Sequence, residues 1–200
     1  MNMSTKEKII QAADSLFSQG GYDAISTRDV AEISKTNKAL IHYYFKNKEG
    51  LFESVLNRYF NSLSDTIENA LLGEGDLKTR LMNLVESYID FLKKNKNYVR
   101  IIQREINGGK YMNRVNQHMI HNFRIVLKAI REAYPKTRSG ELTAEHVLIS
   151  AYGMIITYFT CSDILEKLLD TNPMSEESFQ TREKHIFKMI DIVINEVAKS

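Results

Sequence analysis

A short stretch of the N-terminal part carries four side chains that can hydrogen-bond to nucleic acid. Lys38, His42, Tyr43 and Tyr44 lie within the sequence KALIHYY. Their ammonium, imidazole and phenol groups can reach phosphate oxygens or base edges. A helix this short and this polar is not stable alone. We therefore expect a neighbouring helix to hold it, as in a helix-turn-helix that enters a DNA major groove.

Local signals delimit the helices around this segment. Ser26 and Asp29 have the S-x-x-D spacing of a capping box, which predicts a helix that starts there and runs to about residue 34. We expect that helix to bury Val30, Ala31 and Ile33. After a turn, Thr36 or Asn37 would cap the second helix.

Apolar residues at helical spacing continue through the rest of the chain. They predict further helices at 4–19, 47–72, 76–94, 98–106, 112–134, 143–170 and from 175 onward. The breaks fall at glycines near 20, 73 and 108, at a turn over 95–97, at a polar loop over 135–140 and at Asn172-Pro173. The chain, with only two prolines among 200 residues, is expected to be all-α.

Composition limits the classes of function. The 43% hydrophobic content suffices for an ordinary core, and the formal charge of +2 does not suit a general coat on nucleic acid. Segment 24–48 differs, because five basic residues face two acidic ones, a net +3. A single Cys161 and the lack of an apolar leader indicate a reducing, cytoplasmic compartment. The uncharged stretch 147–162 is shorter than the ~20 residues of a membrane span.

The sequence gives little support for a metal site or for an enzyme active site. His118 and His121 are three residues apart, but no third ligand lies nearby, so solvated or pocket-lining histidines are favoured over a metal site. Cys161 has no companion base, and no nucleophile elbow, phosphate loop or dinucleotide fingerprint occurs. We expect neither an enzyme nor a cofactor. The alternative is an α-helical enzyme whose N-terminal part is only a folding element. Turnover of a small molecule by the purified protein would favour this alternative.

Residues 5–52 resemble the N-terminal part of the TetR-like transcriptional regulators. The Tyr-Tyr-Phe-x-x-Lys ending, Tyr43 to Lys48, is the most specific piece. The chain departs from the family at the turn, where Ser34 to Asn37 replace Ala-Gly-Val-Ser, and at His42, which replaces a tyrosine. The other matching positions, in the family's order and spacing, are Ile9, Ala12, Ala13, Phe17, Gly21, Tyr22, Thr27, Val30, Ala31 and Leu51.

The resemblance implies a DNA-binding helix-turn-helix domain at 1–47 and a helical ligand-binding and dimerisation domain at 48–200, joined by a long fourth helix. It also implies a repressor whose effector shifts that helix; an activator or a ligand-independent regulator is the alternative. It implies phosphate contacts by Thr27, Lys38, Tyr43, Tyr44 and Lys48, and base contacts by Asn37, Lys38, Ala39, Leu40 and Tyr43. The interface would also include Arg28, Thr36 and His42. His42 could donate to phosphate or pack on the first helix, and Leu40 could touch a thymine methyl or complete the core.

Two further surfaces are predicted in the C-terminal part. Apolar and aromatic stripes suggest a pocket for a small, largely hydrophobic effector, with Tyr59, Tyr88, Phe91, Ile102, Glu105, Met119, Phe123, Tyr152, Ile155 and Phe159 as its lining. Glu105 would be a pocket acid or, as buried acids usually are, the partner of an arginine or lysine. A homodimer seam is predicted from Ala151, Gly153, Ile186, Ile190, Val193 and Val197; the stripe on the last helix could instead cover the subunit's own core.

Overall fold

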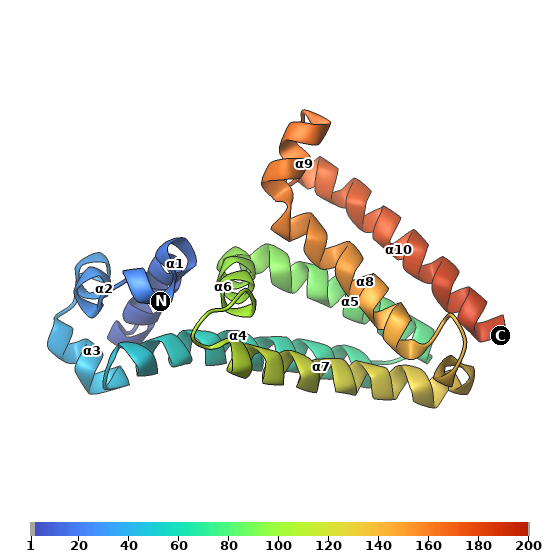
Figure 1. The fold of residues 1–200 in the computed structure, drawn as a ribbon, viewed down its shortest axis with the longest axis horizontal. Coiled ribbons are helices and arrows are strands. Elements are labelled where there is room, and N and C mark those ends of the chain that lie inside the picture. The colour runs from blue at the N-terminus through green and yellow to red at the C-terminus, as the bar shows by residue number, and fades with distance from the viewer. Residues whose placement is uncertain (1–2, 200) are drawn as a thin grey trace. The chain divides into compact units, whose positions relative to one another are not determined.

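The structure is a computed structural model that describes residues 3–199, and this part of the chain is helical without a strand (Figure 1). The all-α prediction is therefore confirmed. The α-helices are α1 (Thr5–Ala24), α2 (Thr27–Ile33), α3 (Lys38–Phe45), α4 (Lys48–Leu72), α5 (Leu77–Lys94), α6 (Lys96–Ile106), α7 (Met112–Ala133), α8 (Ala144–Thr160), α9 (Ser162–Leu169) and α10 (Glu176–Lys199), with a short 3₁₀-helix, η1 (Pro135–Arg138), before α8.

Side-chain caps start the N-terminal helices where the sequence predicted them. The Ser4 and Glu7 capping box opens α1, and the Ser26 and Asp29 box opens α2. The Asn47 side chain accepts the backbone N–H of Gly50 at 2.8 Å at the start of α4. These bonds satisfy backbone donors that have no partner inside the helix.

Contacts divide the chain into two compact units. The first unit contains the residues up to Leu63 together with Asn95–Asn116, so it holds α1, α2, α3, the first part of α4 and the whole of α6. The second contains Ser64–Lys94 and the residues from Gln117 on. The predicted boundary at residue 47 concerns function and stays a prediction.

The prediction of one continuous helix over 143–170 was wrong. The chain bends by 76° between α8 and α9, at Cys161. The Cys161 carbonyl accepts the N–H groups of Ile164 and Leu165, so backbone bonds continue across the bend. Within the described residues, no helix by itself is long and apolar enough to cross a membrane; α8 and α9 reach that length and composition only as a bent pair.

Aromatic side chains form much of the core of the first unit. The rings of Phe17 on α1 and Phe52 on α4 meet edge to face, with centroids 4.8 Å apart. Tyr22 contacts Phe52 at 5.2 Å, and Tyr111, just before α7, contacts both Tyr22 and Phe52. This packing buries the inner sides of α1 and α4 and gives the short helices α2 and α3 a support.

Candidate nucleic-acid interface

The segment α2–turn–α3 has the arrangement of a helix-turn-helix. The Asn37 side chain accepts the N–H of Ala39 at 2.9 Å, so Asn37, rather than Thr36, caps α3. The Thr36 hydroxyl instead lies 2.8 Å from that of Ser34, which donates to the carbonyl of Val30 at 2.6 Å. The turn between the two helices is thus fixed by its own side chains.

Lys35 holds the left-handed position of this turn, with φ at 52°. Its N–H donates to the Glu32 carbonyl at 3.1 Å, and the N–H of Thr36 donates to the Ala31 carbonyl at 2.9 Å. This pair of bonds is a Schellman motif, which usually has glycine at the left-handed residue. The chain therefore makes this turn without the glycine that is usual in the family. The left-handed conformation is sterically less favourable for a lysine than for a glycine.

Helix α3 has one buried and one exposed side. Ile41 and Phe45 are buried, together with Val30 on α2 and Ile9 on α1. The opposite side exposes Tyr43, at 78% of its full surface, and Tyr44, whose rings are 5.1 Å apart. The other exposed residues on or capping α3 are Asn37, Lys38, Ala39, Leu40 and His42.

These positions settle where three side chains lie. His42 is exposed, so it is not packed away on α1, and Leu40 is 36% exposed, so both of its predicted roles stay open. The expected burial of Ile33 was wrong, because its side chain is 58% exposed. Ile33 is the last residue of α2, and the chain turns away immediately after it, so only Val30 of this helix is fully buried.

The predicted DNA-binding residues at the edges of this surface differ in their exposure and in their contacts. Arg28 is exposed and Thr27 half-buried near the start of α2. The Lys48 ammonium donates to the Asp23 carbonyl at 3.2 Å and lies 4.3 Å from the centre of the Tyr22 ring. Lys48 thus ties α4 to the end of α1 as well as lying near α3 in the sequence.

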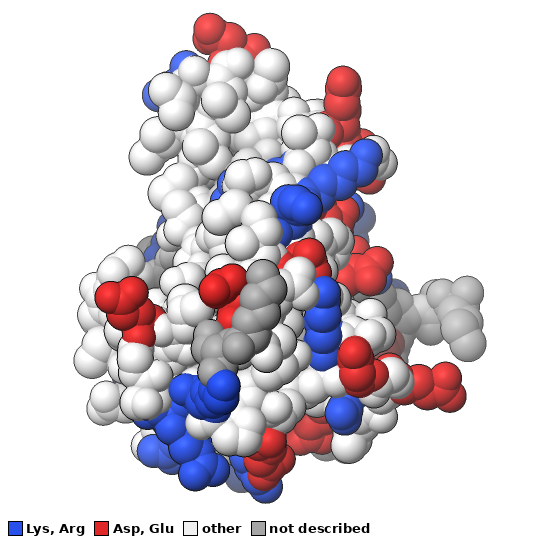
Figure 2. Space-filling view, turned by 90° about the vertical axis from the view of Figure 1, so that its right-hand side faces the viewer, with Lys and Arg blue, Asp and Glu red and all other residues white. Residues whose placement is uncertain are grey.

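The distribution of charged side chains differs between parts of the surface. On the face drawn in Figure 2, Lys and Arg lie among Asp and Glu, and a broad area carries neither sign. By contrast, Arg28, Lys35, Lys38 and Lys46 are exposed within or beside the helix-turn-helix. A local basic set suits a few phosphate contacts better than a general attraction to nucleic acid.

The predicted pocket residues fall into both units. Tyr59, Ile102 and Glu105 belong to the first unit. The other predicted pocket residues belong to the second, where Tyr152 lies 6.3 Å from Tyr88 and 5.2 Å from Phe123, measured between ring centres. In the same unit Phe91 and Ile155 are buried, Met119 is half-buried, and Phe159 lies 5.4 Å from Phe179.

Glu105 is buried as predicted, but its partner is different. Its carboxylate accepts the backbone N–H of Tyr111 at 2.7 Å, and not an arginine or lysine. A Cβ on Gly109 would lie 2.3 Å from the carboxylate, so glycine makes the room for it. Glu105 therefore holds the loop between α6 and α7, and its part in binding an effector stays a prediction.

The predicted dimer residues lie on α8 and α10, which pack against each other. Ile186, Ile190 and Val197 are buried within the single chain, so these three cover its own core. Gly153 has open space beside it. Apolar residues that the sequence analysis did not select, Ile149 on α8 and Ile192 on α10, are 61% and 49% exposed.

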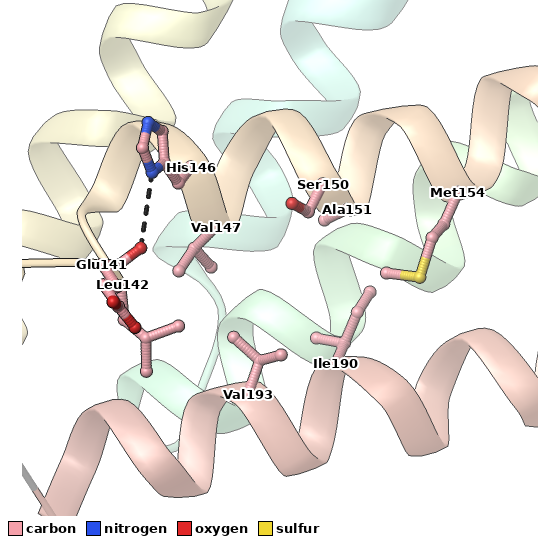
Figure 3. Close-up of a pocket in the computed structure, with 9 residues that line it drawn as sticks. All are labelled: Glu141, Leu142, His146, Val147, Ser150, Ala151, Met154, Ile190 and Val193. Atoms are coloured by element: carbon pink, nitrogen blue, oxygen red, sulfur yellow. Dashed lines mark hydrogen bonds between the residues drawn. The ribbon is translucent and has the colours of Figure 1, made fainter.

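A cavity of about 320 Å³ lies between α8 and α10 (Figure 3). Side chains from α8 and α10 face one another across it, and the loop before α8 closes one end. His146 Nδ1 lies 3.4 Å from the Glu141 carbonyl at that end. The lining residues are Glu141, Leu142, His146, Val147, Ser150, Ala151, Met154, Ile190 and Val193.

The two histidines considered for a metal site do not gather other ligands. His118 Nε2 lies 3.1 Å from the amide nitrogen of Asn122, whose oxygen accepts the Ser64 hydroxyl at 3.1 Å. Over residues 3–199, no three histidine, cysteine or acidic side chains come together in a way that could hold a metal ion.

The fold and the exposed side of α3 define an all-α protein of the helix-turn-helix class. Residues 9–55 match the sequence model of the tetR family of bacterial regulatory proteins. The resemblance to this family that the sequence predicted is confirmed for this N-terminal segment.

Two curated relatives illustrate the sequence similarity. The chain is 33% identical over 108 residues to a Bacillus subtilis protein named "Probable HTH-type transcriptional regulator YttP", covering 53% of this chain and 52% of that protein. It is 30% identical over 101 residues to the HTH-type transcriptional repressor NicS of Pseudomonas putida, covering 50% and 48%. The chain thus spans about half the length of these relatives. They are named as transcriptional regulators, a non-enzymatic family.

Solved structures extend the similarity in fold to nearly the whole chain. The fatty acid degradation regulator FadR of Bacillus halodurans superposes with a TM-score of 0.71, covering 95% of this chain and 96% of that chain. The sequences are 17% identical, so this likeness concerns the fold.

Proposed function

We propose that the protein is a homodimeric, sequence-specific DNA-binding regulator of transcription that acts in the cytoplasm. The observation that carries this is the division of α3 into a buried side, with Ile41 and Phe45, and an exposed side of hydrogen-bonding groups. A short, capped helix of this kind can enter a major groove while its neighbours contact the backbone. Lys38 and Tyr43 would contact phosphates, and Asn37 and Leu40 would approach base edges.

The second part of the proposal is repression relieved by a small, largely hydrophobic effector. NicS is named as a repressor and FadR as a regulator of fatty acid degradation, which favours this direction of control and this kind of ligand. In the second unit, the rings of Tyr88, Phe123 and Tyr152 lie close together, and such a group would suit a largely apolar ligand.

A homodimer is proposed through α8 and α10. Ile149 and Ile192 are large apolar side chains exposed on these helices, and Gly153 leaves room for a close approach. Large apolar residues that are exposed on a single chain are often covered by a partner. A two-fold partner would also place two α3 helices on one DNA duplex.

Selection of bound duplexes from random DNA by the purified protein tests the proposal. We expect enrichment of one sequence with two-fold symmetry. A reporter gene placed behind that sequence separates the two directions of control, because a repressor lowers its expression and an activator raises it. Failure to enrich any sequence, with turnover of a small molecule instead, would support the enzyme hypothesis.

A further inference from the structure

Helix α6 lies in the same compact unit as the helix-turn-helix, although the sequence analysis placed it in the ligand-binding domain. It packs directly on α1. Hydrogen bonds join the two helices at two separate places, one near the middle of α1 and one near its end. Each place involves a different residue of α6.

The first place is the carboxylate of Asp14, which is only 8% exposed. Asn97 on α6 donates its side-chain N–H to this carboxylate at 2.8 Å, and the Arg58 guanidinium of α4 lies 3.5 Å away. The Tyr59 hydroxyl also donates to it. Burial raises the pKa of Tyr59, as does its bond to Asp14, so the hydroxyl keeps its proton. A buried carboxylate needs such partners, and loss of one is costly.

The second place is the C-terminal end of the regular part of α1. The Arg104 guanidinium on α6 donates to the carbonyl oxygens of Phe17 at 3.4 Å and Gln19 at 2.5 Å. Helical geometry ends shortly afterwards, at Gly21 with φ at 77°. The last carbonyls of a helix lack partners within it and carry partial negative charge, which a guanidinium satisfies.

Helix α1 is in turn part of the core that supports α3. Ile9, Ala13 and Phe17 on α1 are buried, as are Val30 on α2 and Ile41 on α3. A close-packed core of this kind moves as one body. Two hydrogen-bonded places fix the direction of a helix, whereas one place would leave it able to pivot.

We propose that Asn97 and Arg104 are positioning residues, which hold α1 to α6 at these two places and thereby set the orientation of α3 for DNA binding. Neither residue lies on the exposed side of α3, so neither needs to contact DNA. This inference rests on the proposed function and deepens it, because it names the residues through which that DNA-binding surface is controlled.

Two DNA duplexes distinguish a change in the orientation of α3 from a loss of the contacts that α3 makes with DNA. One carries both half-sites of a sequence selected by the wild-type protein, and the other carries one half-site with the second scrambled. The variants are Arg104→Ala, at an exposed residue, and Asn97→Ala with Arg104→Ala. Arg100→Ala is the matched control, because it removes the same charge from an exposed position on α6.

We expect the double variant to lose about tenfold or more in affinity for the two-half-site duplex, a loss typical of coupling between sites. Its affinity for the one-half-site duplex should change by less than about twofold, and Arg104→Ala should show the same pattern more weakly. Arg100→Ala should leave both affinities as in the wild type. Wild-type affinities for both duplexes in the double variant, or equal losses on both, would overturn the positioning role. A wild-type protein that selects no duplex would instead contradict the proposed function.

Discussion

Single residues of α3 separate into those that support the fold and those available to DNA. Ile41 and Phe45 are buried, whereas Lys38 and Tyr43 are exposed. Among the exposed residues, a cation and a phenol would contribute to the proposed DNA binding in different ways. Only the cation displaces condensed counterions from the duplex, while a hydroxyl adds a hydrogen bond without changing the charge balance.

Lys38→Gln and Tyr43→Phe should therefore differ in a salt series. Lys38→Gln removes a positive charge, so the slope of log affinity against log salt concentration should become shallower by about 0.9. Tyr43→Phe should weaken binding with an unchanged slope. Fluorescence anisotropy with a labelled duplex measures both. Lys128→Gln, an exposed lysine of the second unit, should match the wild type; an unchanged slope in Lys38→Gln would remove Lys38 from the phosphate contacts.

The left-handed Lys35 gives a prediction for stability. Lys35→Val should lower the free energy of unfolding by roughly 1–2 kcal/mol, because a β-branched side chain is poorly accommodated at a φ of 52°. Lys35→Gly should fold at least as readily, since glycine takes this conformation without steric cost. Chemical denaturation measures both variants. Equal stability of the valine and glycine variants would mean that the turn has another backbone conformation.

At the level of elements, the sequence revealed those boundaries that depend on neighbouring residues. The caps at Ser26 and Asn47 lie three residues from their partners, so their spacing was visible. The bend at Cys161 carries no glycine or proline, and nothing local marked it. The Asn37 cap was one of two alternatives, because both Thr36 and Asn37 can accept such a bond.

The cap of α2 also predicts a dependence on pH. The backbone N–H of Ser26, and then its hydroxyl, lower the pKa of Asp29 below its ordinary value of 3.8. Because the folded-state pKa lies below that of the unfolded chain, the carboxylate stabilises the fold above the unfolded value. This stabilisation is lost as pH falls through the folded value.

Asp29→Asn should therefore destabilise the protein at neutral pH, and its difference from the wild type should shrink as the pH falls below 3.8. Urea unfolding at neutral and acid pH measures this difference. Glu32→Gln removes the same charge from an exposed position on α2 without touching the cap, and should lack this trend. A difference for Asp29→Asn that stays constant with pH would argue against the carboxylate cap.

For the whole molecule, sequence reasoning identified the class of fold but not the grouping of its helices. Helix α6 belongs to the first unit, where it packs on α1, and the bonds of Asn97 and Arg104 to α1 join residues more than 80 positions apart. The stripe on α10 was ambiguous for the same reason. Its spacing predicts an apolar side, while only tertiary contacts decide whether Ile186 and Ile190 cover the subunit's own core.

Ile149→Glu or Ile192→Glu should convert the proposed dimer into monomers in sedimentation velocity, because a charge would be buried at the interface. Both residues are exposed in the single chain, so the fold should survive. Ile190→Glu is a poorer test, since Ile190 is buried and the variant should unfold. Leu72→Glu, at an exposed position at the end of α4, is the control. Dimers of wild-type strength in both test variants would place the interface elsewhere.

The affinity of the wild-type protein for its selected duplex, compared with a scrambled duplex of equal length and composition, tests the DNA-binding function most directly. We predict that the selected duplex binds at least about a thousandfold more tightly at physiological salt, the lower end for specific recognition. Both affinities should fall as salt is added, since phosphate contacts contribute to each. Equal affinity for the two duplexes, or binding that ignores salt, would contradict the account of α3 as a helix that reads DNA.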